Sequence, residues 1–520
     1  MVILFVLAGV AALAVLGGLH WYAWRRLIRD TTSGPGAVRR VGAAVFVAGP
    51  LLMIGAVASE RAGAPFWLQR TLSWPGFLWM ALALYLVLAL LAGELVRPVL
   101  RWAGERRAAG RRKADGAASP AVTERAGPPE TVRSRSGVSP SPEPAEQPAP
   151  AGQPAQPESA GRPAPAGRPA QPELAGRPAP AGQPAQPESV GQLAPAGQPE
   201  SVGRPVSAGQ PEPAGTAEPV GVTGLAEPAG VTGSAELAGA AGVVPLPSRR
   251  LFVSRVVGGA AAAVAVGTVG YGTYGVLRGP AVKRVTVPLA KLPRSAHGFR
   301  IAVVSDIHLG PVLGRGFAQK VVDTINSTQP DLIAVVGDLV DGSVKNLGPA
   351  AAPLAQLRAR HGSYFVTGNH EYFSGAEQWI REVRELGIHP LENARTELAG
   401  FDLAGVNDLQ GESEGQGPDF GKALGDRDRT RACVLLAHQP VQIHEAVRHG
   451  VDLQLSGHTH GGQLWPGNFV AAAANPTLAG LDRYGDTQLY VSRGAGAWGP
   501  PTRVGAPSDI TVVELASLEA

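Results

Sequence analysis

Four long apolar runs stand out along the chain. Residues 2–24, 41–59, 74–93 and 256–276 contain no charged side chain. Each run is close to the roughly 20 residues that a helix needs to cross about 30 Å of hydrocarbon. The pattern predicts four transmembrane helices. Two alternatives are buried helices of a soluble protein and, for the first run, a cleaved signal peptide, although no basic region precedes that run.

The flanks of these runs predict their orientation. Basic residues are numerous just after the first and third runs and just before the fourth, whereas the loop after the second run holds only Arg61 and Arg70. Positive flanks of transmembrane helices stay in the cytoplasm. We therefore expect the N-terminus and everything beyond about Gly279 outside the cytoplasm. Arg249 and Arg250 also resemble a twin-arginine export signal, which would place the C-terminal part on the same side.

The middle of the chain is a low-complexity region, which we place at residues 104–249. Residues 147–161, 162–176 and 177–191 are near-copies of one unit rich in Pro, Ala and Gly, and the region has no Phe, Trp or Tyr. Such a segment cannot bury enough apolar surface to fold. We expect a disordered cytoplasmic linker with extended polyproline II character, acting as a spacer or as a partner-binding segment.

Composition and charge exclude several classes of function. The 520 residues include 68 glycines, 47 prolines and a single cysteine, Cys433. One cysteine excludes an intrachain disulfide framework and a thiolate metal cluster. The net charge of +4 gives no reason to expect nucleic-acid binding.

Beyond the linker, residues 250–280 form the fourth segment, and residues 281–520 have the pattern of an α/β domain. Short apolar runs predict buried strands, and runs with helical spacing alternate with them. The expected strands are 301–304, 332–336, 364–367, 433–437 and 451–455. The expected helices are 316–326, 354–360 and 376–386.

Polar residues that bind metals recur where these strands end. They are Asp306, His308, Asp338, Asn369, His370, His438, His458 and His460. Singly, each fits a turn, a helix cap or a structural histidine. Together they include five of the eleven histidines, at the strand ends where α/β folds collect their sites. Oxygen and imidazole donors without thiolate suit Mn²⁺, Fe or Zn²⁺.

These motifs resemble those of the calcineurin-like metallophosphoesterases, in particular a membrane-tethered bacterial branch. The blocks are Asp306-Ile-His308, Gly337-Asp338-Leu-Val-Asp341, Gly368-Asn369-His370-Glu371, His438 and Gly457-His458-Thr-His460. The resemblance covers about residues 285–515. It implies two mixed sheets packed face to face with helices outside both.

The resemblance also implies a role for each residue of the site. The first of two divalent metal ions would be held by Asp306, His308 and His460, the second by Asn369, His438 and His458, and Asp338 would bridge them. The two ions would activate a hydroxide that attacks phosphorus. His370 would face the leaving oxygen, oriented by Asp341. Arg503 is a candidate for phosphate binding, with a surface position as the alternative.

The function implied is a membrane-anchored metal-dependent phosphoric ester hydrolase. We expect it to hydrolyse a phosphodiester or pyrophosphate bond, in a phospholipid or a lipid-linked envelope molecule. One alternative is a broad phosphomonoesterase or nucleotide phosphodiesterase. Another, of a different class, is a non-catalytic membrane sensor or scaffold.

The predicted orientation can be tested with a protease added to intact protoplasts. We expect digestion of the C-terminal domain and protection of the Pro-rich linker, because the domain is expected outside the cytoplasm and the linker inside it. Immunoblots against each part measure the outcome. Protection of the domain with loss of the linker would reverse the assignment of sides.

Overall fold

A computed structural model of the chain describes residues 2–117 and 248–519. The four apolar runs lie in four helices, α1 Val2–Trp24, α2 Ala37–Arg61, α3 Phe66–Ala117 and α4 Arg249–Leu277. Among the described residues, α2, α4 and residues 66–107 of α3 are long and apolar enough to span a membrane. Most of the expected linker, residues 118–247, lies outside the described residues.

Helix α3 extends further than the sequence predicted. We expected three transmembrane helices within residues 1–103 and the linker from residue 104, and α3 continues to Ala117 through a stretch rich in Ala and Arg. These residues have high helix propensity, so loss of hydrophobicity alone does not end a helix. The change of composition therefore marked the end of the apolar part, not the end of the helix.

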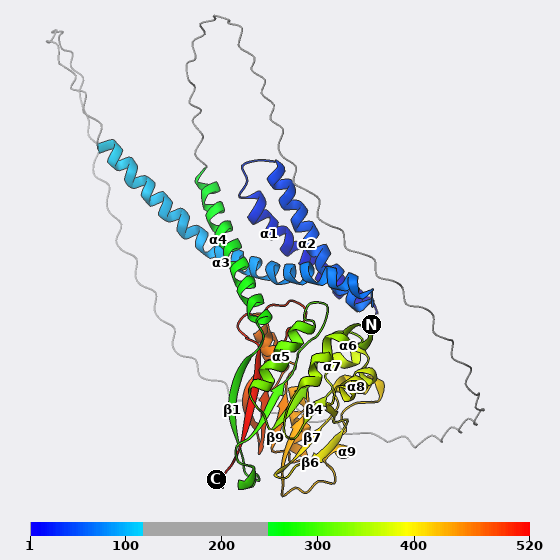
Figure 1. The fold of residues 1–520 in the computed structure, drawn as a ribbon. Helices are drawn as coiled ribbons and strands as arrows, with labels where there is room; N and C mark the ends of the chain where they lie inside the picture. Colours follow the sequence, from blue (N-terminus) through cyan, green and yellow to red (C-terminus); the bar gives the residue numbers. More distant parts are fainter. Residues whose placement is uncertain (1, 118–247, 520) are drawn as a thin grey trace, which may run out of the picture. The chain divides into compact units, whose positions relative to one another are not determined.

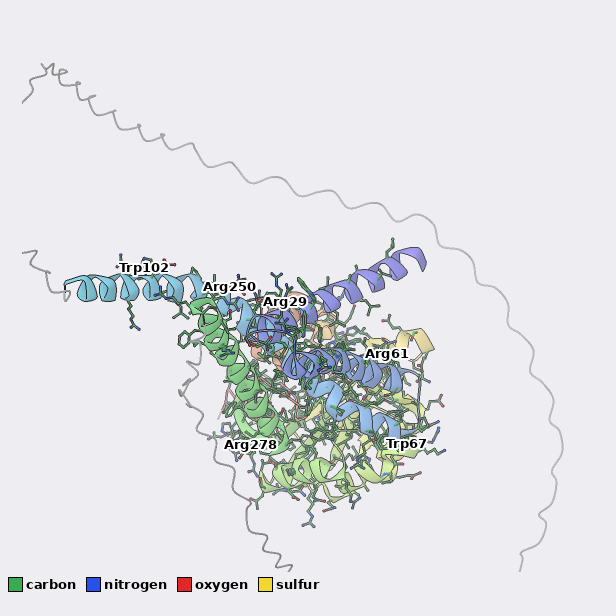
Figure 2. The ribbon with its side chains drawn as sticks, turned by 90° about the horizontal axis from the view of Figure 1, so that it is seen from above. Arg29, Arg61, Trp67, Trp102, Arg250 and Arg278 are labelled. Atoms are coloured by element: carbon green, nitrogen blue, oxygen red, sulfur yellow. The ribbon has the colours of Figure 1, made fainter. Side chains whose placement is uncertain are left out.

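Polar contacts join the helix ends that we expect in the cytoplasm. Arg26, in the short π-helical turn Arg25–Arg29 after α1, pairs with Glu94 of α3 at 2.9 Å. The Nε of Arg255 on α4 donates to the carbonyl of Thr31 at 3.0 Å. Figure 2 labels Arg29 after α1 and Arg250 at the start of α4, which lie near one another, and Trp102 beyond the apolar part of α3. The basic flanks of α1, α3 and α4 thus lie at the same end of the four helices.

The C-terminal part is a sandwich of two mixed sheets with six strands each (Figure 1). The first has the order β1 Ala281–Leu289, β12 Asp509–Ser517, β2 Phe299–Val304, β3 Leu332–Val336, β4 Ser363–Val366 and β5 His389–Pro390. The second has the order β10 Gly480–Tyr484, β11 Thr487–Val491, β9 Leu453–Ser456, β8 Ala432–Leu436, β7 Phe401–Gly405 and β6 Ala394–Glu397. In the first sheet only the β12–β2 pair is antiparallel, and in the second only β10–β11 and β6–β7 are.

Alternating side chains of the central strands build three apolar layers. In β2, Ile301 and Val303 face the second sheet, whereas Ala302 and Val304 face the helices. In β8, Val434 lies in the layer between the sheets, and Cys433 packs with the helices on the other side. The outer helices are α5 Arg315–Ser327, α6 Val344–Ala351, α7 Asn369–Ser374, α8 Ala376–Glu385, α9 Phe420–Leu424, α10 Ile443–Arg448 and α11 Gly467–Ala474. The expected sandwich of two mixed sheets with flanking helices is confirmed.

One expected element is wrong. Residues 354–360 do not form a helix, because the helical part, α6 and a 3₁₀ turn over Ala352–Gln356, ends before Leu357. Leu357 has an extended backbone with φ −61° and ψ 136°. Leu354, one of the apolar residues that suggested the helix, lies in the 3₁₀ turn and packs against the first sheet.

Helix α4 connects directly to the sandwich. Only Arg278, Gly279 and Pro280 separate it from β1. On α4, Thr273 Oγ1 lies 2.7 Å from Thr502 Oγ1, and the Gly272 carbonyl accepts from the backbone N–H of Arg503 at 3.3 Å. The segment around Arg503, far from α4 in sequence, therefore packs on this helix.

Candidate metal centre

The expected metal ligands lie in the turns that follow β2, β3, β4, β8 and β9. Five of them have a left-handed backbone, namely Asp306, His308, Asp338, His458 and His460, with φ between 49° and 72°. This region is costly for residues other than glycine, at about 1–3 kcal/mol each. Such strain persists only when the surrounding structure holds the turn in place, and it is typical of functional sites. The left-handed backbone turns these five side chains toward the candidate metal centre.

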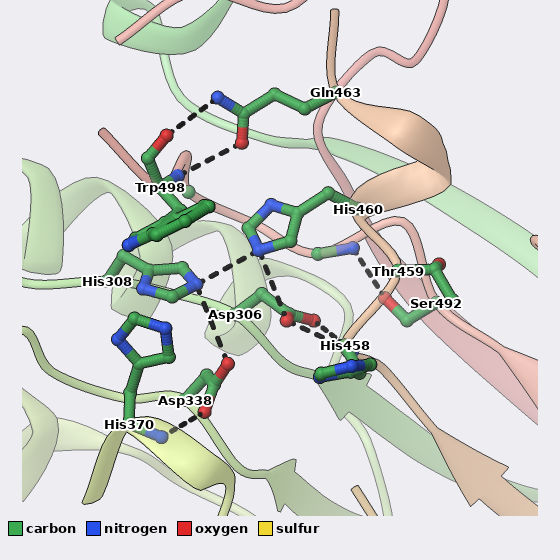
Figure 3. Close-up of polar contacts among 12 residues, drawn as sticks. Asp306, His308, Asp338, His370, His458, Thr459, His460, Gln463, Ser492 and Trp498 are labelled. Carbon is green, nitrogen blue, oxygen red and sulfur yellow. Dashed lines mark hydrogen bonds and ion pairs between the residues drawn. The ribbon is translucent and has the colours of Figure 1, made fainter. Parts of the chain in front are cut away.

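The first group of ligands comes from the turn after β2 and the turn after β9. Nε2 of His308 lies 3.0 Å from Nε2 of His460, which lies 3.4 Å from Oδ1 of Asp306 (Figure 3). All three side chains are buried. The Asp306 carboxylate also accepts the backbone N–H of His458 at 3.0 Å. One carboxylate thereby orders the turn that carries both histidines of the Gly-His-x-His block.

The second group contains Asp338, His438, His458 and Asn369. Nε2 of His438 is 3.1 Å from Oδ2 of Asp338, and Nδ1 of His458 is 3.0 Å from Oδ1 of Asn369. The same Oδ2 of Asp338 lies 3.8 Å from Nε2 of His308. Asp338 is therefore close to ligands of both groups. The structure brings together all seven residues that the sequence singled out as metal ligands.

The hydrogen bonds of these histidines show that the residues fit a cation. Nδ1 of His438 lies 2.8 Å from the Val336 carbonyl, and Nδ1 of His308 lies 2.8 Å from Oδ1 of Asp341. A carbonyl and a carboxylate only accept, so both protons belong on Nδ1. In a neutral His438 ring, Nε2 keeps its lone pair and faces Oδ2 of Asp338 at 3.1 Å in a buried site. A buried carboxylate that faces an imidazole lone pair is stabilised by a positive charge between them, which a proton or a metal ion can supply.

Without cations, protons on histidine balance part of this charge. Burial opposes charge on His438, but the Asp338 carboxylate raises its pKa well above the usual value. Burial and the charge of His438 lower the pKa of His458 to about 4. Burial, followed by the charge of His308, also lowers the pKa of His460. A metal ion would therefore compete with a proton at His438. The rings of His458 and His460 are neutral near pH 7, the form that can bind a metal.

Asp341 and His370 form a pair beside the ligands. Oδ1 of Asp341 lies 2.7 Å from Nδ1 of His370 and 2.8 Å from Nδ1 of His308. Although burial opposes charge on the ring, the hydrogen bond and charge of Asp341 raise the pKa of His370 to about 9. Burial favours the neutral acid of Asp341, but His308 and His370 lower its pKa to about 2. Asp341 thus fixes Nδ1 of His370 and favours the protonated form of its ring.

Glu371 is a functional residue whose role the sequence left undefined. Its carboxylate is fully buried and accepts three backbone N–H groups, from Gly368 at 2.6 Å, Leu339 at 2.8 Å and Asp338 at 3.0 Å. Burial, followed by the charge of Asp338, raises its pKa to about 7. Glu371 fastens the turn after β3 to the turn after β4. The sequence signal that could have pointed to Glu371 is its place in the Gly-Asn-His-Glu block.

An aromatic rim beside His370 was missed from the sequence. Trp498 is 56% exposed and Phe373 is 66% exposed, and both rings lie edge-on to His370, with centroids 5.8 Å and 5.6 Å away. The side-chain amide of Gln463 accepts from Trp498 N at 3.0 Å and donates to its carbonyl at 2.8 Å (Figure 3). Gln463, the last residue of Gly-His-Thr-His-Gly-Gly-Gln, therefore fixes the backbone that carries Trp498.

Arg503 lies inside the site's supporting structure. Its guanidinium is buried and donates to the carbonyls of Gly496, Arg493, Ala506 and His460. Nη2 lies 3.0 Å from Nδ1 of His460. These contacts occupy the donors that phosphate would need, so we propose Arg503 as a positioning residue for His460 in place of the phosphate-binding role suggested by the sequence.

Comparison with known proteins connects this site to a family. The sequence profile of the calcineurin-like phosphoesterases matches residues 299–462. The chain is 39% identical over 259 residues to a transmembrane protein with metallophosphoesterase domain from Danio rerio, covering 47% of this chain and 59% of that protein. The corresponding protein of Bos taurus is 41% identical over 253 residues, covering 45% of this chain and 57% of that protein.

A shorter relative is matched along most of its length. An uncharacterised metallophosphoesterase of Aquifex aeolicus is 35% identical over 239 residues, covering 45% of this chain and 91% of that protein. By contrast, the chain spans under two thirds of the Danio and Bos proteins. The likeness to the Aquifex protein accordingly extends over nearly all of that protein.

Gly457 offers a test of how the ligand cluster is held. A Cβ at this position would clash with the Asp306 carboxylate and the Ser305 hydroxyl. We expect Gly457→Ala to displace Asp306 and weaken metal binding about 10- to 100-fold, the usual effect of disturbing the support of a ligand. Elemental analysis after dialysis against limiting Mn²⁺ measures the loss.

Gly316→Ala is the matched control, because its Cβ would meet no atom within 4 Å. It should retain the metal content of the unmodified protein. Full metal content in Gly457→Ala, with a cooperative thermal transition, would contradict the placement of Asp306 in the site.

Proposed function

The chain belongs to the calcineurin-like phosphoesterase family, and we propose that it is a membrane-anchored hydrolase of a phosphodiester or pyrophosphate bond. The proposed substrate is a phospholipid or a lipid-linked envelope molecule. The family supports phosphoester hydrolysis and the clustered histidines and aspartates suit two metal ions. The choice of bond and of a lipid substrate is our inference from the surroundings of the site.

The observation that carries the proposal is the position of Asp338 between two groups of nitrogen and oxygen ligands. Its Oδ2 lies 3.1 Å from His438 Nε2 and 3.8 Å from His308 Nε2. A carboxylate in this position can be shared by two cations. When bound, two divalent ions neutralise phosphate oxygens and lower the pKa of a water, which makes a nucleophile available near neutral pH.

The side chains around these ligands have complementary tasks. Asp341 holds Nδ1 of His370, so that Nε2 carries the proton toward the leaving oxygen. Glu371 fixes the backbone at Asp338, and a further N–H, from His370, reaches Oδ1 of Asp338 at 2.9 Å. The backbone of His370 and the proposed bridging carboxylate are thus joined by a hydrogen bond, which favours a fixed arrangement of acid and bridge.

The contacts of the site with the apolar helices support a lipid substrate. The Tyr85 hydroxyl on α3 donates to the Trp465 carbonyl at 2.9 Å, five residues after His460. Phe77 of α3 packs 3.9 Å from the Cβ position of Gly499, next to Trp498. The exposed aromatic rim beside His370 therefore continues to helices that we expect in the bilayer. A substrate with its phosphate at the membrane surface would reach the site without leaving the membrane.

Replacing Asp338 tests the bridging role. We expect Asp338→Asn to lower metal-dependent hydrolysis of bis(p-nitrophenyl) phosphate, and of phosphodiesters in extracted membrane lipids, to the background rate. The reason is that the amide removes the charge shared by the two sites. Turnover of the full chain in detergent with added Mn²⁺ measures the effect.

Asp486→Asn is the control, because this carboxylate is fully exposed. It should hydrolyse at the rate of the unmodified protein. Near-normal turnover by Asp338→Asn would refute the bridge, and preference for p-nitrophenyl phosphate over the diester would favour a phosphomonoesterase.

His370→Asn separates proton donation from metal binding. We expect this variant to keep its metal but to lose about 10²–10⁴-fold in turnover, the usual contribution of a positioned acid. The loss should be smaller for diesters whose leaving group is a weak base, because such groups need no proton. Metal analysis and rates on a series of leaving groups provide the measurement.

The control is His444→Asn, since His444 is exposed on α10 and outside the ligand groups. This variant should have the metal content and the turnover of the unmodified protein. Parallel loss of metal and turnover in His370→Asn would show instead that His370 is a ligand.

A further inference from the structure

A cavity lies where the apolar helices meet the sandwich, outside the metal centre. It has a volume of about 560 Å³ and is lined by the start of α3, the end of α4, the segment 310–317 and α6. Its apolar wall includes Phe66, Leu277, Leu313 and Phe317. We call it the interfacial cavity.

Three cationic side chains border this cavity. Arg70 of α3 and Arg315 and Lys320 of α5 are all exposed. Arg315 donates to the Pro349 carbonyl at 2.9 Å and Lys320 to the Leu277 carbonyl at 2.5 Å. In residues 2–117 and 248–519, none of the three forms an ion pair with a carboxylate within 4.0 Å. Their positive charge is therefore available to an anion.

The position of the cavity relates it to the surface of the bilayer. Phe66 is the first residue of α3 and Leu277 is the last residue of α4, so both helices have their ends at the cavity. Trp67, next to Phe66, is 68% exposed, and tryptophan at a helix end is typical of the interface between hydrocarbon and water (Figure 2). If α3 and α4 span the membrane, the cavity lies at the level of the headgroups.

We propose that the interfacial cavity binds the phosphate headgroup of an anionic phospholipid in the leaflet next to the catalytic domain. Arg70, Arg315 and Lys320 face the phosphate, and the acyl chains extend along α3 and α4. A basic pocket between helix ends suits such a headgroup. The inference depends on the membrane anchoring in the proposed function, and it is independent of hydrolysis.

The bound lipid would also contact the loop that leads into the metal centre. Gly310 lines the cavity and lies two residues after His308, and a Cβ at Gly310 would be 3.4 Å from Cβ of Asp341. The headgroup site and the hydrolytic site are thus on either side of one short segment. The lipid would hold the catalytic domain against the membrane surface at this segment.

The test uses the full chain, delipidated in dodecyl maltoside and titrated with dioleoyl phosphatidylglycerol or dioleoyl phosphatidylcholine. Native mass spectrometry counts bound lipids. We expect tighter binding of phosphatidylglycerol, and a loss of about fivefold for each charge removed in Arg70→Gln, Arg315→Gln and Lys320→Gln. Arg70→Lys with Arg315→Lys should retain the binding, which separates loss of charge from misfolding.

The control combines Arg294→Gln, Arg360→Gln and Arg429→Gln, three exposed arginines that precede β2, β4 and β8 at the opposite edge of the sheets. It should bind phosphatidylglycerol normally. Equal affinity for the two lipids, equal loss in the control, or displacement of the lipid by equimolar inorganic phosphate would overturn the proposal. Because the measurement counts lipids, it gives the same answer whether or not the protein hydrolyses phosphodiesters.

Discussion

The convergence of buried imidazole nitrogens on the Asp338 carboxylate is the constraint on which the site depends. Nε2 of His438 and Nε2 of His308 both face Oδ2 of Asp338, because Val336 and Asp341 take the protons on the other ring nitrogens. The strained turns that carry these residues would relax unless something held them. Glu371 supplies part of that restraint with three hydrogen bonds to the backbone. The two sheets supply the rest, since their buried strands end at this point.

The apolar helices and the sandwich contact each other through the loops around the site and through shared apolar clusters. The segment 502–504 packs on α4, and Trp465 is bonded to Tyr85 of α3. Both segments belong to loops that support the metal centre, Trp465 through the turn after His460 and Arg503 through its contact with the His460 ring. The loops around the site are therefore shaped from one side by the sheets and from the other by the helices.

Local pattern made the central strands and the ligand set predictable, because apolar runs and strand-end motifs are properties of short segments. Strand β3 was expected at residues 332–336 and lies there. The helix expected at residues 354–360 is absent because the apolar residues there pack without forming a helix. Helix α3 is longer than its apolar part, because a helix can continue through residues that are not apolar. The partners of Arg503, Gln463 and Glu371 could not be predicted, since each joins loops that only the folded sheets bring together. A charged residue near a Gly/Pro-rich segment suggests ligand binding, yet the Arg503 guanidinium contacts the ring and carbonyl of His460.

The short connection between α4 and β1 limits where the site can act. Three residues reach at most about 10 Å even when fully extended, so the sandwich has no freedom to diffuse away from its anchor. For a lipid substrate, the enzyme would encounter only molecules in its own bilayer. Its rate would follow the mole fraction of that lipid in the surface rather than its concentration in the bulk volume. Dilution of the membrane with inert lipid would slow it, and adding more vesicles of the same composition would not speed it up.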